Sequence, residues 1–216
     1  MNPREGEISY RILQMPERRL RRPGGFNFLE QELTRCSVGG FSLVRGCSAI
    51  DPAPGWFESK RLRFLLARNG HPLHANDPAR GEVGDDGCEY TVVVMTLIGP
   101  PAGDATLYAH NTADEINDLS RYGYRVVECQ AWSRFWLIIL ERPFGLKASS
   151  VRYEVVPIAR TEAAAVADDR TIVGMVATRT HLFPIRVVPG RVRRATARIP
   201  EREPQTSRVP AGTSAS

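Results

Sequence analysis

The sequence predicts an α+β protein with two duplicated β-α-β-β units, whose antiparallel sheets pack against short helices, followed by extra C-terminal strands and a basic tail. Two observations predict this fold class. The strand-like segment Tyr10–Met15 is echoed at Tyr90–Met95 and again at Tyr153–Ile158. After the first two of these segments, a helical pattern and then a glycine follow in the same order. Self-similarity along a chain is the signature of an internal repeat.

Each echoed segment begins with tyrosine and continues with β-branched or aliphatic residues, the composition of a mostly buried strand. Short amphipathic helices are predicted next, at Phe28–Cys36 and Ala113–Leu119, because their apolar residues recur at helical spacing. In the second unit, Thr112 precedes Glu115 by three residues. That spacing matches a capping box and predicts a helix start at Thr112.

Gly40 and Gly123 follow the two helices at the same offset, where a left-handed turn favours glycine. The aromatic and aliphatic residues after each glycine predict a second strand. A third strand is predicted at Leu62–Arg68 in the first unit and at Trp136–Arg142 in the second. Each unit is therefore expected to be β-α-β-β.

The third echo lacks the glycine turn of the other two. A short helix at Thr161–Asp169 and strands at Thr171–Thr178 and Leu182–Val188 are predicted there. This region is either a degenerate third unit or an extension of the second sheet. The expected divisions are a first unit at 1–70, a linker at 71–87, a second unit at 88–148, the third region at 149–188, and an Arg/Pro/Ser-rich tail at 189–216, flexible unless a partner binds it.

Three segments follow one another in the second unit: Glu115–Leu119, Gly123–Val127 and Leu140–Arg142. In this order they resemble a small bacterial and phage domain family of unknown function. The family pattern is a strand, a helix and turn of the form L-N-x-L-x-x-x-G-W-x-[LV]-V, and a closing strand that ends in Arg or Lys. Tyr124 stands here for the usual tryptophan. The resemblance covers 89–143, and 8–68 more weakly, and it implies a fold without an activity.

Composition excludes several classes of protein. The chain has 216 residues with 42% hydrophobic and 25% charged side chains, as in ordinary globular proteins. The longest strongly apolar run, Phe135–Leu140, is much shorter than the roughly 20 residues that span a bilayer. No apolar segment follows the basic N-terminus, so we expect no signal peptide and a cytoplasmic or virion-associated protein. The four cysteines are spaced widely and are expected to be free thiols without disulfides.

The motifs of enzymes are missing from the sequence. It contains no phosphate-binding glycine loop, no dinucleotide fingerprint and no nucleophile elbow. His71 and His74 flank a proline within the linker, which prevents the helical spacing of a metal site. We therefore expect no catalytic residues, no cofactor and no metal, and a protein that is not an enzyme.

The formal net charge of +5 comes from residues 186–216, which hold seven of the 27 arginines and only two acidic residues. The sequence predicts a non-enzymatic interaction or assembly protein, such as a phage or bacterial structural component, that contacts protein subunits as an oligomer. The alternative is nucleic-acid binding through the Arg18–Arg22 loop, the sheet aromatics and the basic tail. No membrane partner is expected. The candidate contact residues are Arg18, Arg19, Arg21, Arg22, Trp56, Phe57, Arg191, Arg193, Arg194 and Arg198.

Overall fold

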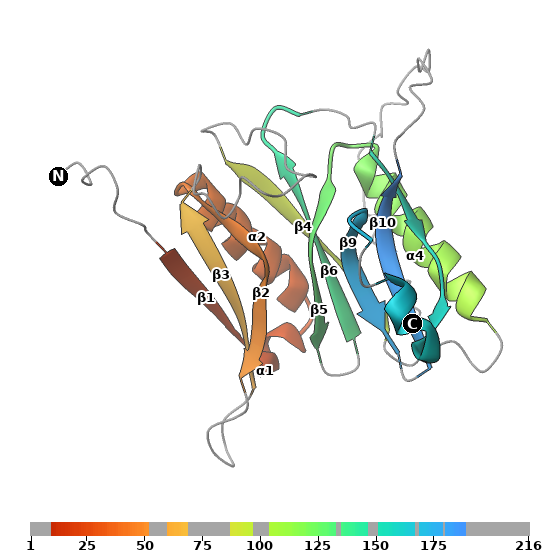
Figure 1. The fold of residues 1–216 in the computed structure, drawn as a ribbon. Helices are drawn as coiled ribbons and strands as arrows, with labels where there is room; N and C mark the ends of the chain where they lie inside the picture. The colour runs from red at the N-terminus through yellow and green to blue at the C-terminus, as the bar shows by residue number, and fades with distance from the viewer. Residues whose placement is uncertain are drawn as a thin grey trace, which may run out of the picture.

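The fold consists of three small antiparallel sheets that follow one another in chain order (Figure 1). The structure is a computed structural model. It describes residues 10–51, 60–68, 87–96, 104–132, 135–146, 151–166, 169–178 and 180–188. Three α-helices and one 3-10 helix accompany the sheets in the described residues. The predicted α+β class is confirmed.

Sheet A contains the first three strands. Its strands are β1 (Tyr10–Pro16), β2 (Phe41–Asp51) and β3 (Arg61–Arg68), in the order β1-β3-β2. Helices α1 (Glu17–Leu20) and α2 (Gly25–Val38) connect β1 to β2. Gly40 begins the turn into β2 with a φ of 84°, a conformation that costs other residues energy.

Sheet B repeats this arrangement. Its strands are β4 (Cys88–Thr96), β5 (Arg125–Trp132) and β6 (Phe135–Pro143), in the order β4-β6-β5, and α4 (Ala105–Ser120) connects β4 to β5. The registers correspond as well: Tyr10 lies opposite Ala67 in sheet A, and Tyr90 lies opposite Glu141 in sheet B. Gly123, with a φ of 92°, occupies the place of Gly40.

The third region forms sheet C. Its elements are β7 (Arg152–Val155), β8 (Ile158–Ala159), the 3-10 helix η1 (Arg160–Val166), β9 (Ile172–Ala177) and β10 (His181–Val188). The last strand, β10, is again central and pairs with β7, β8 and β9. Sheets A, B and C thus each place the last strand between the first and the penultimate one.

Helix α4 corrects the predicted helix start. It begins at Ala105, and the Asp104 carboxylate caps it by accepting a hydrogen bond from the Leu107 N–H at 2.9 Å. Thr112 lies inside the helix, where its hydroxyl donates to the Tyr108 carbonyl at 2.8 Å. A threonine can make that internal bond as well as a cap, so its position in the sequence was ambiguous.

Two hydrophobic cores lie between the sheets. One joins sheet A, α2 and one face of sheet B, through residues such as Phe64, Leu33 and Ile139. The other joins the opposite face of sheet B to α4 and sheet C, through residues such as Ile138 and Phe183. Sheet B is therefore buried on both faces, which explains the continuous apolar run in β6, because a two-sided strand has no polar face.

Cysteine burial follows from these cores. All four cysteines are free thiols; Cys36 and Cys88 are buried, whereas Cys47 is exposed.

No helix of the described residues is long and apolar enough to cross a membrane. The predicted linker 71–87 and tail 189–216 lie outside the described residues, apart from Gly87.

Candidate interaction interface

Helix α2 of the first unit is bonded to the edge strand of the second. β4 is the outer strand of sheet B, and its outward N–H groups receive side-chain acceptors from α2. The Ser37 hydroxyl accepts from Cys88 N at 2.5 Å, and the Thr34 hydroxyl accepts from Tyr90 N at 3.0 Å. One turn earlier, the Glu30 carboxylate accepts from Val92 N at 2.7 Å. Three side chains of one helix face thus satisfy the backbone of an edge that would otherwise be open.

Helix α4 of the second unit makes the same kind of contact with the third. Asn117 is bonded twice to Tyr153 of β7, donating to its carbonyl at 2.8 Å and accepting from its N–H at 2.7 Å. The Ser120 hydroxyl donates to the Val151 carbonyl at 2.6 Å. Asn117 and Ser120 have the same three-residue spacing as Thr34 and Ser37. The two helices therefore use corresponding positions to contact the backbone of the next region, although Ser37 accepts from an N–H and Ser120 donates to a carbonyl.

The tyrosines that begin the second and third echoed segments add to these contacts. Tyr90 is 3% exposed, and its hydroxyl accepts a hydrogen bond from Leu43 N of β2 at 3.2 Å. Tyr153 is 2% exposed, and its hydroxyl accepts from Val126 N of β5 at 3.0 Å. In each case the phenol reaches the second strand of the preceding unit. The echoed tyrosines thus bond one unit to the next.

A polar contact joins β2 to β5 between sheets A and B. The Glu128 carboxylate accepts from Gly46 N at 2.7 Å and from Cys129 N at 3.0 Å. Arg45 donates to the Val126 carbonyl at 2.9 Å. Burial raises the pKa of Glu128, and the two backbone hydrogen bonds partly oppose that rise because they favour the carboxylate.

Sheets B and C are in close contact at Gly174. A methyl group at this position would lie 2.4 Å from the Cys129 sulfur. The residue Cys129 is only half-buried, but its sulfur is enclosed and accepts a hydrogen bond from the Met175 N–H. Burial, with a smaller contribution from Glu128, raises the pKa of Cys129 to about 12. Nearby, Trp136 Nε1 donates to the Ala177 carbonyl at 2.9 Å.

The arginine cluster of the first unit begins on a helix and continues into the turn after it, which corrects the predicted loop for Arg18 and Arg19. Arg18 and Arg19 belong to α1, and Arg21 and Arg22 follow it directly. The helix forms here because Leu20 is buried in the core at 1% exposure, and the four arginines are all exposed around it. Arg21 pairs with Glu17 at 2.6 Å, and the Arg19 guanidinium lies over the Phe28 ring at 3.4 Å.

The other candidate contact residues lie outside the described residues: Trp56, Phe57, Arg191, Arg193, Arg194 and Arg198. The aromatic side chains of sheet B are partly in the core. Tyr124 is buried beneath the Arg142 guanidinium, and Phe135 packs into the first core. Tyr122 is exposed, at the turn before β5. The described aromatics of sheet B therefore do not form one open stacking surface.

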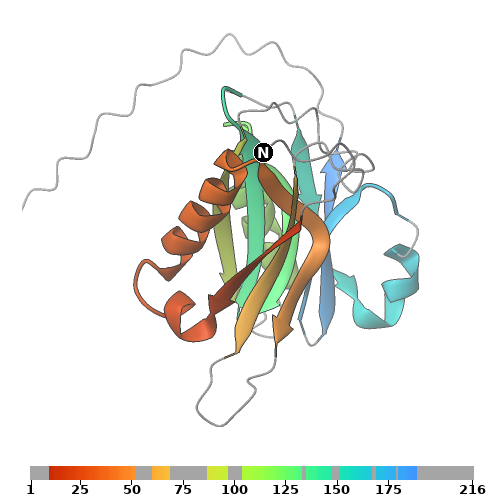
Figure 2. The same ribbon diagram turned by 90° about the vertical axis from the view of Figure 1, so that its left-hand side faces the viewer.

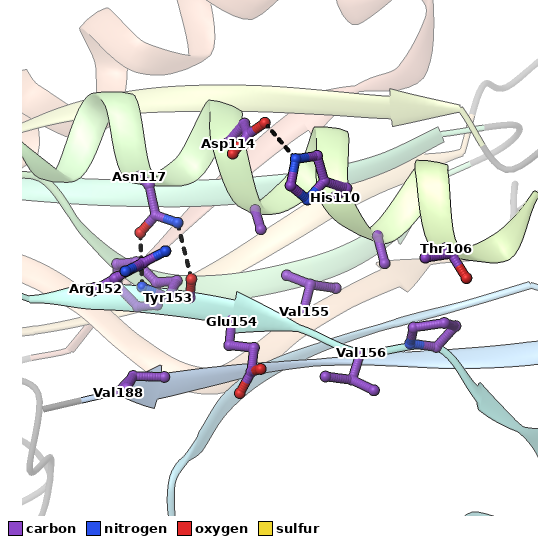
Figure 3. Close-up of a pocket in the computed structure, with 13 residues that line it drawn as sticks. Thr106, His110, Asp114, Asn117, Arg152, Tyr153, Glu154, Val155, Val156 and Val188 are labelled. Carbon is purple, nitrogen blue, oxygen red and sulfur yellow. Dashed lines mark hydrogen bonds and ion pairs between the residues drawn. The ribbon is translucent and has the colours of Figure 1, made fainter.

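A groove of about 520 Å³ lies between α4 and β7 (Figure 3). Its wall includes His110 and Asp114, whose Nε2 and Oδ2 atoms are 3.3 Å apart, with both side chains mostly exposed. Ala113 occupies the helix position at which α2 carries Glu30. The shorter side chain leaves the groove open beside Val155, the counterpart of Val92. Because both side chains are mostly exposed, their interaction is well screened by water and salt.

Among the described residues, no group of three or more His, Cys, Asp or Glu side chains could hold a metal ion. No family model, curated protein or solved structure matches the chain. The resemblance to a bacterial and phage domain family stays a prediction.

The residues of the helix-to-strand contacts were missed at the sequence level. Glu30, Thr34 and Ser37 look like ordinary polar positions of an amphipathic helix. Their alignment with Asn117 and Ser120 offered a signal, because both helices keep short polar side chains at the same two positions. Each of these side chains bonds to a backbone group more than 30 residues away in the sequence. No local pattern specifies such a distant partner.

Proposed function

We propose that the chain is a non-enzymatic interaction or assembly protein, a phage or bacterial structural component that contacts partner protein subunits. The observation that carries this proposal is the repeated helix-to-edge-strand contact, made by Thr34 and Ser37 on β4 and by Asn117 and Ser120 on β7. A contact that is used twice within one chain is a modular way of attaching β-α-β-β units. We also infer that the units arose by duplication, from their shared strand order and register.

The proposal is supported by where the polar side chains are used. Glu30, Asn117 and Glu128 each make a hydrogen bond to the backbone of a neighbouring unit or region. An assembly scaffold needs rigid junctions of this kind, because its task is to hold surfaces in fixed positions.

Nucleic-acid binding is the second candidate. It is favoured by the exposure of Arg18, Arg19, Arg21 and Arg22 around one helical turn. Guanidinium groups bind phosphates well, and several such contacts make affinity strongly dependent on salt. The pairing of Arg21 with Glu17 reduces the charge available in that cluster.

Light scattering on a size-exclusion column, with absorbance at 260 and 280 nm, separates the two candidates. The full chain is measured at low and high salt, alone and after expression in its host. The assembly proposal expects a defined oligomer or co-purified protein complex that is free of nucleic acid and persists at high salt. A chain that carries nucleic acid at low salt and loses it at high salt would favour the second candidate and overturn the first.

A further inference from the structure

The outer face of sheet A is the counterpart of two surfaces that are covered elsewhere in the chain. Tyr10 and Ile12 hold the register positions in sheet A that Tyr90 and Val92 hold in sheet B. Tyr90 and Val92 face α2 and sheet A, and Tyr153 and Val155 face α4 and sheet B. Each unit therefore presents this face to the unit before it.

The first unit has no preceding unit in the described chain. Tyr10 is 49% exposed and Ile12 is 56% exposed, whereas Tyr90 and Tyr153 are almost completely buried. Leu65, opposite Ile12 on β3, is half-buried. β1 lies at the side of the molecule farthest from sheet C and faces the viewer in Figure 2. Exposed apolar side chains on an edge strand are typical of a binding surface.

The N–H groups of alternate residues in β1 point away from the sheet, as the corresponding N–H groups in β4 do. Glu17 N, one residue beyond the strand, donates to the Lys60 carbonyl at 2.8 Å, so odd-numbered residues direct their N–H groups toward β3. Even-numbered residues such as Ile12 therefore direct theirs away from β3, toward the outer edge of sheet A, since these directions alternate along a strand. Pro16, which has no N–H, falls on that outward side, where proline is tolerated.

Neither of the two long helices in the described part of the chain is left to cover β1, and α1 is only four residues long. α2 is bonded to β4, and α4 is bonded to β7. η1 is a short, kinked 3-10 helix that packs on sheet C, where Arg160 donates to the Thr178 carbonyl at 2.8 Å. A second copy of the described chain would bring the same occupied helices. The face fits a helix supplied by a different protein.

We propose that the outer face of sheet A binds a helix of a partner protein, one with Glu, then Thr or Asn four residues later, then Ser three residues after that. This inference rests on the proposed assembly function and names its partner surface. The spacing is that of Glu30, Thr34 and Ser37 in α2. The partner glutamate accepts from Ile12 N, as Glu30 does from Val92 N, and it pairs with Arg11, which stands where β4 has Thr91.

A peptide with the α2 sequence is the probe, because α2 already binds the equivalent edge. Residues 24–39 are synthesised with a hydrocarbon staple between positions 27 and 31, which are exposed in α2. The staple is needed because isolated helices of this length are marginal in water. Fluorescence anisotropy of the labelled peptide is measured against the full chain. We expect saturable binding that weakens about tenfold for a peptide with Thr34→Ala and Ser37→Ala.

Variants of the chain locate the binding surface. Ile12→Pro removes the outward N–H and should weaken binding about tenfold, whereas Ile12→Val keeps the N–H and should bind normally. Arg11→Glu should also weaken binding of the wild-type peptide, and a peptide with Glu30→Lys should restore it. If Ile12→Pro fails to fold, the pair of Arg11→Glu and the Glu30→Lys peptide still tests the surface. Arg11 is exposed, so its substitution leaves the core intact.

Three results would overturn the inference. The first is no saturable binding up to about 0.5 mM chain. The second is binding that neither Ile12→Pro nor Arg11→Glu alters. The third is a dimer of the chain that Ile12→Pro dissociates, which would identify a second copy as the occupant. If light scattering still shows an assembled, nucleic-acid-free complex, any of these overturns the partner helix and leaves the proposed assembly function standing.

Discussion

The hydroxyl of Tyr90 accepts a hydrogen bond from the backbone N–H of Leu43, 47 residues earlier in the chain, at 3.2 Å. The same hydroxyl donates to the buried Glu141 carboxylate at 3.2 Å. One side chain thus connects the first strand of the second unit to the second strand of the first unit. The contact recurs between Tyr153 and Val126, so it belongs to the way the units are joined.

Removing the Tyr90 hydroxyl should destabilise the fold. Tyr90→Phe removes the buried hydroxyl that bonds to both the Leu43 N–H and the Glu141 carboxylate. We therefore expect the free energy of unfolding to fall by about 1–3 kcal/mol. Tyr10→Phe removes the equivalent hydroxyl from an exposed position and should change it by less than about 0.5 kcal/mol. Urea unfolding followed by fluorescence measures both, and equal losses would contradict the assigned role of Tyr90.

Helix α4 provides a matched pair of asparagines. Asn117→Ala breaks both hydrogen bonds to Tyr153 and should lower the free energy of unfolding by about 1–3 kcal/mol. Asn111→Ala, an exposed position of the same helix, should be neutral or slightly stabilising because alanine has the higher helix propensity. Thermal unfolding by circular dichroism compares them. The interface is wrong if Asn111→Ala costs as much as Asn117→Ala.

Gly174 should tolerate a methyl group only if the Cys129 sulfur is removed. Gly174→Ala overpacks the junction of sheets B and C and should cost about 1–3 kcal/mol. Adding Cys129→Ala should recover much of that loss, because it creates the space that the new methyl needs. Adding Cys47→Ala, which removes an exposed thiol, should recover nothing. Independent, additive effects of the Gly174 and Cys129 substitutions would refute the contact.

The titration of Glu128 should make the free energy of unfolding larger at acid pH than at neutral pH. Because burial raises its pKa in the folded state, the folded protein binds more protons than the unfolded chain above about pH 4.3. Stability therefore declines as the pH rises through the folded-state pKa of Glu128. Glu128→Gln should abolish this part of the decline, whereas Glu154→Gln, at an exposed position, should keep it. Urea unfolding between pH 4 and 8 follows the difference, and parallel curves for wild type and Glu128→Gln would contradict it.

The thiols should differ in reactivity. Cys47 is exposed, whereas Cys36 and Cys88 are buried and the raised pKa of Cys129, about 12, keeps its enclosed sulfur protonated at neutral pH. Iodoacetamide should therefore modify Cys47 first in the folded protein, and the other three only after unfolding. Peptide mass spectrometry after brief labelling identifies the modified residue. Early modification of Cys129 would show that its sulfur is accessible.

Local pattern was sufficient for most elements of the fold. Strand β6 was predicted from its apolar run and α2 from its helical spacing, and Gly40 was expected to be left-handed. The start of α4 was wrong because Thr112 and Asp104 are both good cap residues, and only the packing of Ala109 and Tyr108 in the second core decides between them. Cap chemistry is local, but its choice depends on which residues the core requires.

The sequence by itself determined the repeated strand and helix order, because hydrophobic periodicity and glycine position act over a few residues. It also marked Tyr10, Tyr90 and Tyr153 as equivalents. Only the tertiary structure decided that two of them bond to a neighbouring unit and that Tyr10 stays exposed. The burial of each tyrosine depends on which strand packs against its face of the sheet. The hydrogen-bond partners of Tyr90 and Tyr153 come from strands that are distant in the chain. An exposed tyrosine and a buried one have the same local signature, so the exposure of Tyr10 stands out only beside the burial of Tyr90 and Tyr153.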